Sequence, residues 1–292
     1  MKAIILCGGM GTRLREYTEV RPKPMVEVGG RPMLWHIMKI YAYHGITDFV
    51  LCLGYKGHVI KDYFLNYEAM NSDFTVELGS PDGMKLYRTG HNERGWRVTL
   101  AETGESTMTG ARVLRAAEYL DAGDENFMVT YGDGVSDVNL RAVLEFHRQH
   151  GKTATLTGVR PPSRFGELER DGNEVVAFSE KPPAGQGLIN GGFFCFRRSF
   201  LNYLADDAAC VLEREPLERC AAESELCVFE HPGYWQCMDT YRDWENLEKL
   251  WQTGEAPWHV WRWDLACAQR TGEGLATGHS GDYSNVAQKK TA

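Results

Sequence analysis

Short runs of consecutive apolar residues, alternating with segments of helical periodicity, constrain the fold of this chain most strongly. The runs cover residues 3–6 and 49–53, and similar strand patterns that include threonine cover residues 127–130 and 154–157. Uninterrupted apolar runs of this length are typical of strands that are covered on both faces. Helical spacing of apolar residues recurs at residues 34–41, 59–67, 110–120 and 140–149. Strands that alternate with helices predict βαβ units, and therefore an α/β fold with a mainly parallel sheet.

Two stretches have a different, β-rich character. Residues 74–103 contain several short strand patterns separated by turn-forming residues, and a second such stretch begins at Pro161 and continues to residue 196. Helices are then predicted at residues 200–204, 215–222 and 240–250, with a strand at 226–229. Residues 263–292 are polar and have no sustained period, so we expect a poorly ordered tail.

Composition excludes several classes of function. The chain has 292 residues, of which 43% are hydrophobic and 25% charged, and a formal net charge of -8. These values are typical of a globular domain, and the negative charge argues against a nucleic-acid partner. No apolar segment is long enough to span a bilayer, so we predict no membrane partner. The 8 cysteines include no C-x-x-C pair, which favours buried free thiols, and the 9 histidines show no metal-binding spacing.

A glycine-rich loop directly follows the first apolar run. Gly8, Gly9 and Gly11 permit close backbone approach, so that N–H groups can face an anion. Arg13 and Lys23 add positive charges suited to phosphate. The loop therefore predicts a polyphosphate site at the carboxyl end of a parallel strand. The alternative interpretation is a tight turn with a surface arginine.

Several motifs, taken in order, resemble one enzyme family. They are Gly8-Gly9-Met10-Gly11-Thr12-Arg13-Leu14 with Lys23-Pro24, then Tyr131-Gly132-Asp133-Gly134, Glu180-Lys181-Pro182, Ile189-Asn190-Gly191-Gly192, and Trp235-Gln236-Cys237-Met238-Asp239-Thr240. Together they resemble the signature of the sugar-1-phosphate nucleotidyltransferases. The resemblance implies a Rossmann-like sheet sandwiched by helices, with a smaller β-rich portion for sugar binding and oligomerisation. It also implies a domain over residues 1–262, with a nucleotide-binding part at about 1–150 and a sugar-binding part at about 151–262.

The resemblance implies an in-line attack by a sugar 1-phosphate on the α-phosphorus of a nucleoside triphosphate. Asp133 and Asp239 would hold the Mg²⁺ cofactor, Arg13 would stabilise the departing pyrophosphate, and Lys23 would contact phosphate near the reacting centre. From the residues alone, Asp239 is also readable as a turn or helix-cap residue. We expect the neighbouring Asp137 to be a helix N-cap.

The same resemblance assigns residues to the two substrates. The nucleotide-binding set is Leu6, Cys7, Gly8, Gly9, Gly11, Thr12, Arg13, Thr107, Arg112 and Gly132. The sugar-phosphate set is Lys23, Glu180, Lys181, Asn190 and Gly191. Residues 103–112 resemble the segment beside the base in cytidylyltransferases. Cytosine presents two adjacent acceptors that suit the donor-only guanidinium of Arg112, which favours CTP over UTP or dTTP.

The expected reaction therefore converts CTP and α-D-glucose 1-phosphate to CDP-glucose and pyrophosphate. Another sugar 1-phosphate, or UTP or dTTP, stays open as an alternative. A metal-dependent glycosyltransferase uses a preformed nucleotide sugar and would need no triphosphate-binding site, so the glycine loop argues against that function. A nucleotide-sugar sensor would release no pyrophosphate. Family resemblance also implies a homo-oligomer, with a hexamer as one candidate. We expect a cytoplasmic location, because the sequence shows neither a secretory apolar region nor a membrane-spanning segment.

Overall fold

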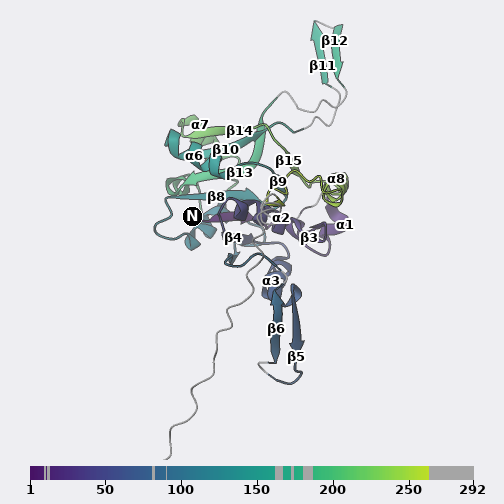
Figure 1. Cartoon of the computed structure of the whole chain (residues 1–292). Coiled ribbons are helices and arrows are strands. Elements are labelled where there is room, and N and C mark those ends of the chain that lie inside the picture. The colour runs from purple at the N-terminus through teal and green to yellow at the C-terminus, as the bar shows by residue number, and fades with distance from the viewer. Residues whose placement is uncertain are drawn as a thin grey trace, which may run out of the picture. The chain divides into compact units, whose positions relative to one another are not determined.

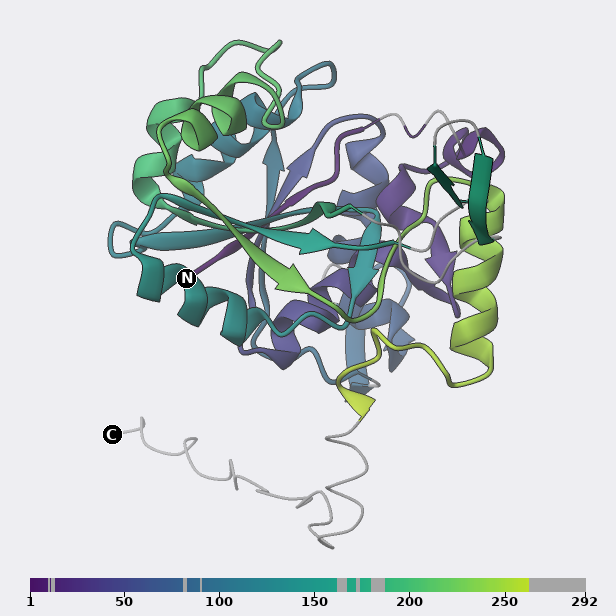
Figure 2. The ribbon, with the colours of Figure 1, turned by 90° about the horizontal axis from the view of Figure 1, so that it is seen from above.

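The central sheet confirms the predicted α/β architecture. The structure, a computed structural model, describes residues 1–9, 11, 14–80, 83–89, 91–161, 167–171, 174–179 and 187–262, so the predicted tail lies outside the described residues. Within these ranges, seven strands form one sheet in the order β14-β10-β13-β8-β1-β4-β7 (Figures 1 and 2). Its strands are β1 (Ala3–Leu6), β4 (Asp48–Leu53), β7 (Arg97–Glu102), β8 (Asn126–Tyr131), β10 (Ala154–Val159), β13 (Ile189–Arg197) and β14 (Leu226–His231). Only β13 is antiparallel to its neighbours, β10 and β8.

Two strands belong to a different part of the fold than their sequence context indicated. The β-rich stretches at residues 74–103 and 161–196 suggested separate β structure, but β7 pairs in parallel with β4, and β13 lies in the middle of the sheet. The shorter pairs, all antiparallel, are β2 (Glu27–Val28) with β3 (Arg31–Pro32), β5 (Ser72–Val76) with β6 (Met84–Thr89), β9 (Gly134–Ser136) with β15 (Trp235–Cys237), and β11 (Glu167–Asp171) with β12 (Glu174–Ser179).

One face of the sheet packs on helices from the middle of the chain. These are α5 (Thr109–Ala116), the 3-10 helices η3 (Ala117–Tyr119) and η4 (Arg198–Tyr203), and α7 (Glu215–Ala222). Ile4, Val50, Phe194 and Phe196 face them, in one buried cluster with Phe200 of η4. Alternate residues of a strand point to opposite faces, so this cluster uses every second position. The uninterrupted apolar runs supply both faces.

The opposite face is covered by α2 (Met33–Tyr43) and α6 (Leu140–His150). Tyr41 of α2 stacks on Phe193 with ring centroids 6.1 Å apart. His147 of α6 hydrogen-bonds Thr155 through Nδ1 at 2.8 Å, and both side chains are buried. The remaining helices are α1 (Arg15–Thr18), η2 (Lys23–Met25), α3 (Gly57–Leu65), α4 (Tyr67–Met70) and α8 (Tyr241–Gln252). None of the helices in the described part of the chain has the length and apolar character of a membrane span.

Helix caps decide the roles of two aspartates. Asn139, not Asp137, is the N-cap of α6, and its side chain accepts hydrogen bonds from two backbone N–H groups of the first turn. The expectation for Asp137 was therefore wrong: its Oδ1 accepts from the N–H of Tyr234 at 2.7 Å and lies 2.9 Å from Nε2 of His231. Thr240 is the N-cap of α8 and forms a capping box with Asp243, which leaves the Asp239 side chain without the capping role that the residues alone had allowed.

Candidate active site

The order of the strands places a crevice beside β1. From β1 the chain continues to β4 and then β7 on one side of β1, and it then returns to β8 on the other side. The loops that follow β1 and β8 therefore leave the sheet in different directions. In open α/β sheets such a switch point is the usual ligand site.

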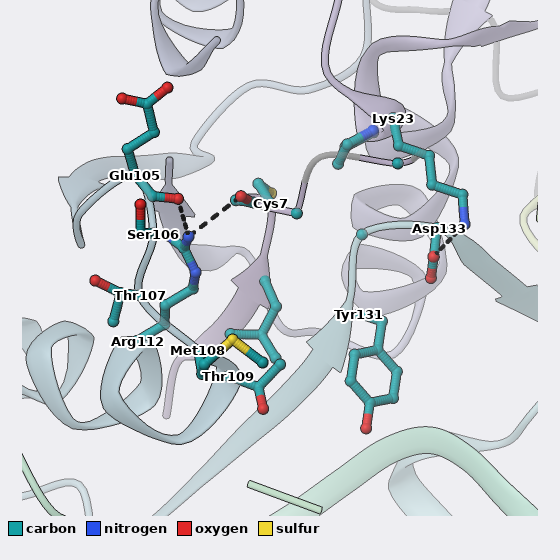
Figure 3. A pocket seen from close by; sticks show the side chains of 16 residues that line it. Cys7, Lys23, Glu105, Ser106, Thr107, Met108, Thr109, Arg112, Tyr131 and Asp133 are labelled. Carbon is teal, nitrogen blue, oxygen red and sulfur yellow. Dashed lines mark hydrogen bonds and ion pairs between the residues drawn. The ribbon is translucent and has the colours of Figure 1, made fainter. Parts of the chain in front are cut away.

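A cavity of about 540 Å³ lies at this point (Figure 3). Its lining includes ten residues that the sequence assigned to the site, namely Leu6, Cys7, Gly8, Gly9, Gly11, Lys23, Thr107, Arg112, Gly132 and Asp133. Lys23 and Asp133 lie at one end, and Arg112 lies at the other end with Glu105 and Ser106. The glycine loop and the predicted base segment, about 100 residues apart in the sequence, thus line one cavity.

The glycines of the loop have different roles. Gly11 has a φ of 59°, a conformation that favours glycine. A Cβ at Gly8 would lie 2.2 Å from Cζ of Arg112, whereas a Cβ at Gly9 would meet nothing within 4 Å. Between described residues, no hydrogen bond uses the N–H of Gly8, Gly9 or Gly11. Gly8 therefore makes room for Arg112, and the loop keeps backbone donors available for an anion.

Arg112 links the ends of three strands to the predicted base segment. Its guanidinium donates to the carbonyl oxygens of Leu53 (2.8 Å), Gly8 (3.2 Å) and Glu105 (3.1 Å) and to Oγ1 of Thr103 (2.8 Å). Burial lowers the pKa of Arg112 from its ordinary value, but an arginine remains charged in proteins. All four terminal N–H groups are thus engaged, and the side chain fixes the shape of one end of the cavity.

Lys23 and two aspartates form the charged centre of the site. Nζ of Lys23 lies 2.7 Å from Oδ2 of Asp133 and 2.6 Å from Oδ1 of Asp239. Lys23 is only 8% exposed. Burial alone would lower its pKa, but the two carboxylates outweigh burial and raise the pKa above its ordinary value. The three residues come from positions far apart in the sequence, so the fold itself assembles this centre.

A short antiparallel pair sets the two aspartates side by side. Asp133 directly precedes β9 and Asp239 follows β15, and Cys237 of β15 is opposite Gly134 of β9. The N–H of Met238 also donates to the carbonyl oxygen of Asp133 at 2.8 Å. Sγ of Cys237 lies 3.6 Å from Oδ2 of Asp239, and burial, with Asp239 nearby, raises the pKa of this thiol to about 12. Cys237 is therefore a neutral neighbour of the centre.

A second cavity of about 230 Å³ meets the first at Tyr131 and Asp133. Its lining contains Thr130, Tyr131, Asp133, Gly134, Asn190, Gly191, Phe193, Trp235, Cys237 and Asp239. Asn190 and Gly191, which the resemblance assigned to the sugar phosphate, thus line the smaller cavity, whereas the glycine loop lines the larger one. The charged centre lies where the two cavities meet.

Four predicted site residues, Thr12, Arg13, Glu180 and Lys181, lie outside the described residues. Their roles stay predictions. Other lining residues were not assigned from the sequence, among them Pro24, Glu105, Ser106, Met108, Thr109, Tyr131 and Trp235. Tyr131 carried a usable signal because it ends a buried strand immediately before Gly132 and Asp133. Trp235 begins the last of the quoted motifs, but its contact depends on the tertiary fold, since its indole donates to the carbonyl oxygen of Gly191 at 2.7 Å.

The charged centre has the ligands that suit a divalent cation. Two carboxylates already converge on one positive charge, that of Lys23. Oxygen ligands of this kind suit Mg²⁺, which binds to one or two carboxylates and completes its coordination with water and phosphate. The described residues contain no group of three or more His, Cys, Asp or Glu side chains arranged as a metal site. The donor set thus fits an ion that shares its coordination with a substrate.

Comparison with known proteins places the chain in a family. Residues 2–252 match the family model described as "Nucleotidyl transferase". The chain is 52% identical over 263 residues to the glucose-1-phosphate cytidylyltransferases of Salmonella typhi and Salmonella typhimurium, which covers 89% of this chain and 100% of each relative. The solved structure of HddC from Yersinia pseudotuberculosis is 22% identical, with a TM-score of 0.61 over 86% of this chain and 99% of that one, and shows the same fold. The glycine loop, the paired aspartates and these matches agree: the chain belongs to the nucleotidyl transferase family.

Proposed function

We propose that the protein transfers a cytidylyl group from CTP to α-D-glucose 1-phosphate, forming CDP-glucose and pyrophosphate. The observation that carries this proposal is the meeting of two cavities at Lys23, Asp133 and Asp239. The larger cavity has the size and the backbone donors for a nucleotide, and the smaller one is of a size for a sugar. Relatives that are 52% identical over their whole length carry the corresponding name.

The chemistry requires positioning and charge neutralisation rather than a protein nucleophile. A phosphate oxygen of the sugar 1-phosphate attacks the α-phosphorus of CTP, the bond to the β-phosphate oxygen breaks, and pyrophosphate leaves. Lys23 lies at the junction of the cavities, where it can bind oxygens of the reacting phosphates. The N–H groups of Gly8, Gly9 and Gly11 would hold the remainder of the triphosphate, and Arg13 is proposed to stabilise the departing pyrophosphate.

Use of a divalent metal is general to this family, and we infer that the ion is Mg²⁺ held by Asp133 and Asp239. When bound, the ion would neutralise charge on the phosphate oxygens around the α-phosphorus. The β9–β15 pairing would hold the two carboxylates side by side as its ligands. In the structure, the ammonium of Lys23 lies between the same two carboxylates. When metal and nucleotide bind, Lys23 must therefore share these carboxylates with the ion or give up its contacts with them.

Base choice is proposed to depend on the end of the cavity around Arg112 and Thr107. Arg112 donates to four protein oxygens, and one of them, 3.1 Å away, is the carbonyl oxygen of Glu105 in the loop between β7 and α5. Exchange of that contact for cytosine would give a guanidinium N–H facing O2 or N3 of the base. Thr107 Oγ1 accepts from Nη1 of Arg115 at 3.0 Å, so its own hydroxyl hydrogen is available to an acceptor on the base.

Steady-state release of pyrophosphate tests the proposal directly. We expect CTP to exceed UTP and dTTP in kcat/KM by roughly tenfold or more, because a mismatched base leaves a buried donor unpaired. Glucose 1-phosphate is expected to be the best of a panel of sugar 1-phosphates. Asp133→Asn and Asp239→Asn should each lower kcat by roughly a hundredfold or more. Asp62→Asn, at an exposed position of α3, is the control; a preference for UTP or another sugar would overturn the substrate assignment.

We further propose a homo-oligomer in the cytoplasm, where CTP is available, with a hexamer as the candidate assembly. The support is the β5–β6 ribbon. Phe74 pairs with Leu86 and Val76 pairs with Met84, so the four share one face of the ribbon. Each is between 42% and 55% exposed. An apolar face of this kind on a two-stranded ribbon needs a partner, and a second copy of the chain is the occupant we propose.

A further inference from the structure

Glu213 lies outside both cavities yet contacts residues that line each of them. Its Oε2 accepts a hydrogen bond from Oγ1 of Thr109 at 2.7 Å, and its Oε1 accepts one from the hydroxyl of Tyr131 at 2.5 Å. Thr109 lines the larger cavity, and Tyr131 lines both. Nδ2 of Asn190, in the smaller cavity, donates to the same Tyr131 hydroxyl at 3.2 Å. A continuous chain of hydrogen bonds therefore runs from one cavity to the other through Glu213.

The carboxylate sets the direction of every bond in this chain. An ionised carboxylate only accepts, so the Tyr131 hydroxyl must donate to Glu213. The phenol oxygen is then left with lone pairs, which face the amide nitrogen of Asn190. Burial, followed by the charge of Glu213, raises the pKa of Tyr131, so the phenol keeps its proton at neutral pH. Tyr131 can thus only accept from Asn190.

The orientation of the Asn190 amide is fixed at its other end as well. Its Oδ1 accepts from the N–H of Gly192 at 2.9 Å. With Oδ1 held by Gly192 and one Nδ2 hydrogen directed to Tyr131, a second Nδ2 hydrogen remains for a ligand in the cavity. Gly192 itself has a φ of 78°, and a Cβ there would lie 2.3 Å from the Tyr131 ring. Packing and hydrogen bonding therefore hold Tyr131 and Asn190 in one arrangement.

We propose that Glu213 is a positioning residue for the sugar 1-phosphate: acting through Tyr131, it fixes Asn190 as a donor to a sugar hydroxyl oxygen. This inference rests on the proposed function, because it takes the smaller cavity to be the sugar site. Glu213 is not a catalytic residue, since it reaches neither substrate. Its effect is on selection of the acceptor: a sugar 1-phosphate that lacks the contacted hydroxyl leaves the Asn190 donor unpaired and is rejected.

The test combines Glu213→Ala and Tyr131→Phe with a panel of monodeoxyglucose 1-phosphates. Each variant should raise KM for glucose 1-phosphate roughly tenfold, the usual effect of losing one oriented hydrogen bond, and leave KM for CTP within about threefold. Each should also reduce the discrimination against the deoxy analogue that the unaltered enzyme rejects most strongly. Because Glu213 acts through Tyr131, the double variant should be no worse than Tyr131→Phe alone. Glu215→Ala, an exposed carboxylate two residues away that pairs with Arg219, is the matched control.

Asn190→Ala distinguishes a failure of the positioning role of Glu213 from a failure of the proposed sugar site. If this variant leaves KM for glucose 1-phosphate unchanged, the smaller cavity is not the sugar site and the proposed assignment fails. If Asn190→Ala raises KM while Glu213→Ala and Tyr131→Phe keep the normal KM and the normal discrimination, the positioning role of Glu213 is wrong. Additive effects of Glu213→Ala and Tyr131→Phe would likewise overturn it. Tyr131→Phe retains the aromatic ring, so a folding defect in Glu213→Ala does not remove the test.

Discussion

At the scale of single residues, Lys23 has the most unusual environment in the site. A nearly buried ammonium lies between two carboxylates, each within 2.7 Å. Removal of one member of such a group leaves buried charge without compensation. Without Lys23, Asp133 and Asp239 would repel each other, and a divalent cation would relieve that repulsion. In the proposed mechanism, Lys23 is therefore both a phosphate ligand and a competitor of the metal.

Lys23→Met separates these two roles. We expect kcat to fall by roughly a hundredfold, because charge on the reacting phosphates is no longer neutralised. The ligand-free variant should bind Mn²⁺ or Mg²⁺ roughly tenfold more tightly than the unaltered protein, since the ion no longer competes with a charged hydrogen-bond donor. Titration calorimetry, or electron paramagnetic resonance with Mn²⁺, measures the second effect without turnover. Weaker metal binding in Lys23→Met would contradict the competition.

Gly8 and Gly9 form a matched pair for testing the role of Arg112. A methyl group at Gly8 would displace a guanidinium that holds four hydrogen bonds, whereas one at Gly9 meets open space. Gly8→Ala should therefore lower the free energy of unfolding of the ligand-free protein by about 1–3 kcal/mol, the usual cost of overpacking. Gly9→Ala should change it by less than about 0.5 kcal/mol. Denaturant unfolding without nucleotide measures both, and equal effects would show that Arg112 can move at little cost.

At the scale of elements, periodicity predicted the strands and helices but not which strands pair. The runs that became β1, β4, β8 and β10 were recognisable because both faces of each strand are covered. β13 was also recognisable as apolar, but nothing local determines that it inserts antiparallel between β10 and β8. Pairing is a tertiary property, so β7 and β13 were grouped with their neighbours in the sequence.

The same limit applies to the site. Residues at the carboxyl ends of strands, such as Asp133, were predictable because parallel strands bring those ends together. Glu213 was not, because its role depends on contacts with Tyr131 and Thr109, which lie 82 and 104 positions away in the sequence. Asp137 was mistaken for a cap because its partner, Tyr234, is equally remote. Local patterns identify candidates, and remote contacts decide their roles.

The β5–β6 ribbon makes the proposed assembly testable at this scale. Val76→Lys combined with Leu86→Lys puts two charges on its apolar face and should reduce the mass of the assembly. Thr75→Lys adds charge to the opposite face, where Thr75 pairs with Lys85, since alternate residues of a strand point to opposite faces. That control should keep the native mass. Sedimentation velocity at several concentrations distinguishes the two, and an unchanged mass in the first variant would exclude this face as the interface.

At the scale of the whole molecule, a buried histidine links stability to pH. His36 of α2 is fully buried, and its Nε2 donates to the carbonyl oxygen of Val28 at 2.8 Å. Its Nδ1 lies 3.4 Å from Nε1 of Trp258, which can only donate, so the imidazole is neutral with Nδ1 as acceptor. Burial lowers the pKa of His36 to about 4. Protonation of His36 would make Nδ1 a donor that faces the donor Nε1 of Trp258. The Trp251 ring packs edge-on against the imidazole, with ring centroids 4.5 Å apart.

The pKa of this histidine is lower in the folded protein than the value of about 6.5 in an unfolded chain. Its contribution to stability is therefore complete above about pH 6.5 and is lost as the pH falls toward 4, by about 1.4 kcal/mol per pH unit.

His36→Gln keeps a donor for Val28 but does not titrate. Between about pH 7.5 and pH 5.5 this variant should lose less of its free energy of unfolding than the unaltered protein does. His58→Gln, at an exposed position of α3, should behave like the unaltered protein. His44 and His147, whose pKa values burial also lowers to about 4, are among the groups that maintain a slope in His36→Gln. If denaturant unfolding gives the same loss for His36→Gln as for the unaltered protein, His36 does not take up the proton that destabilises the fold.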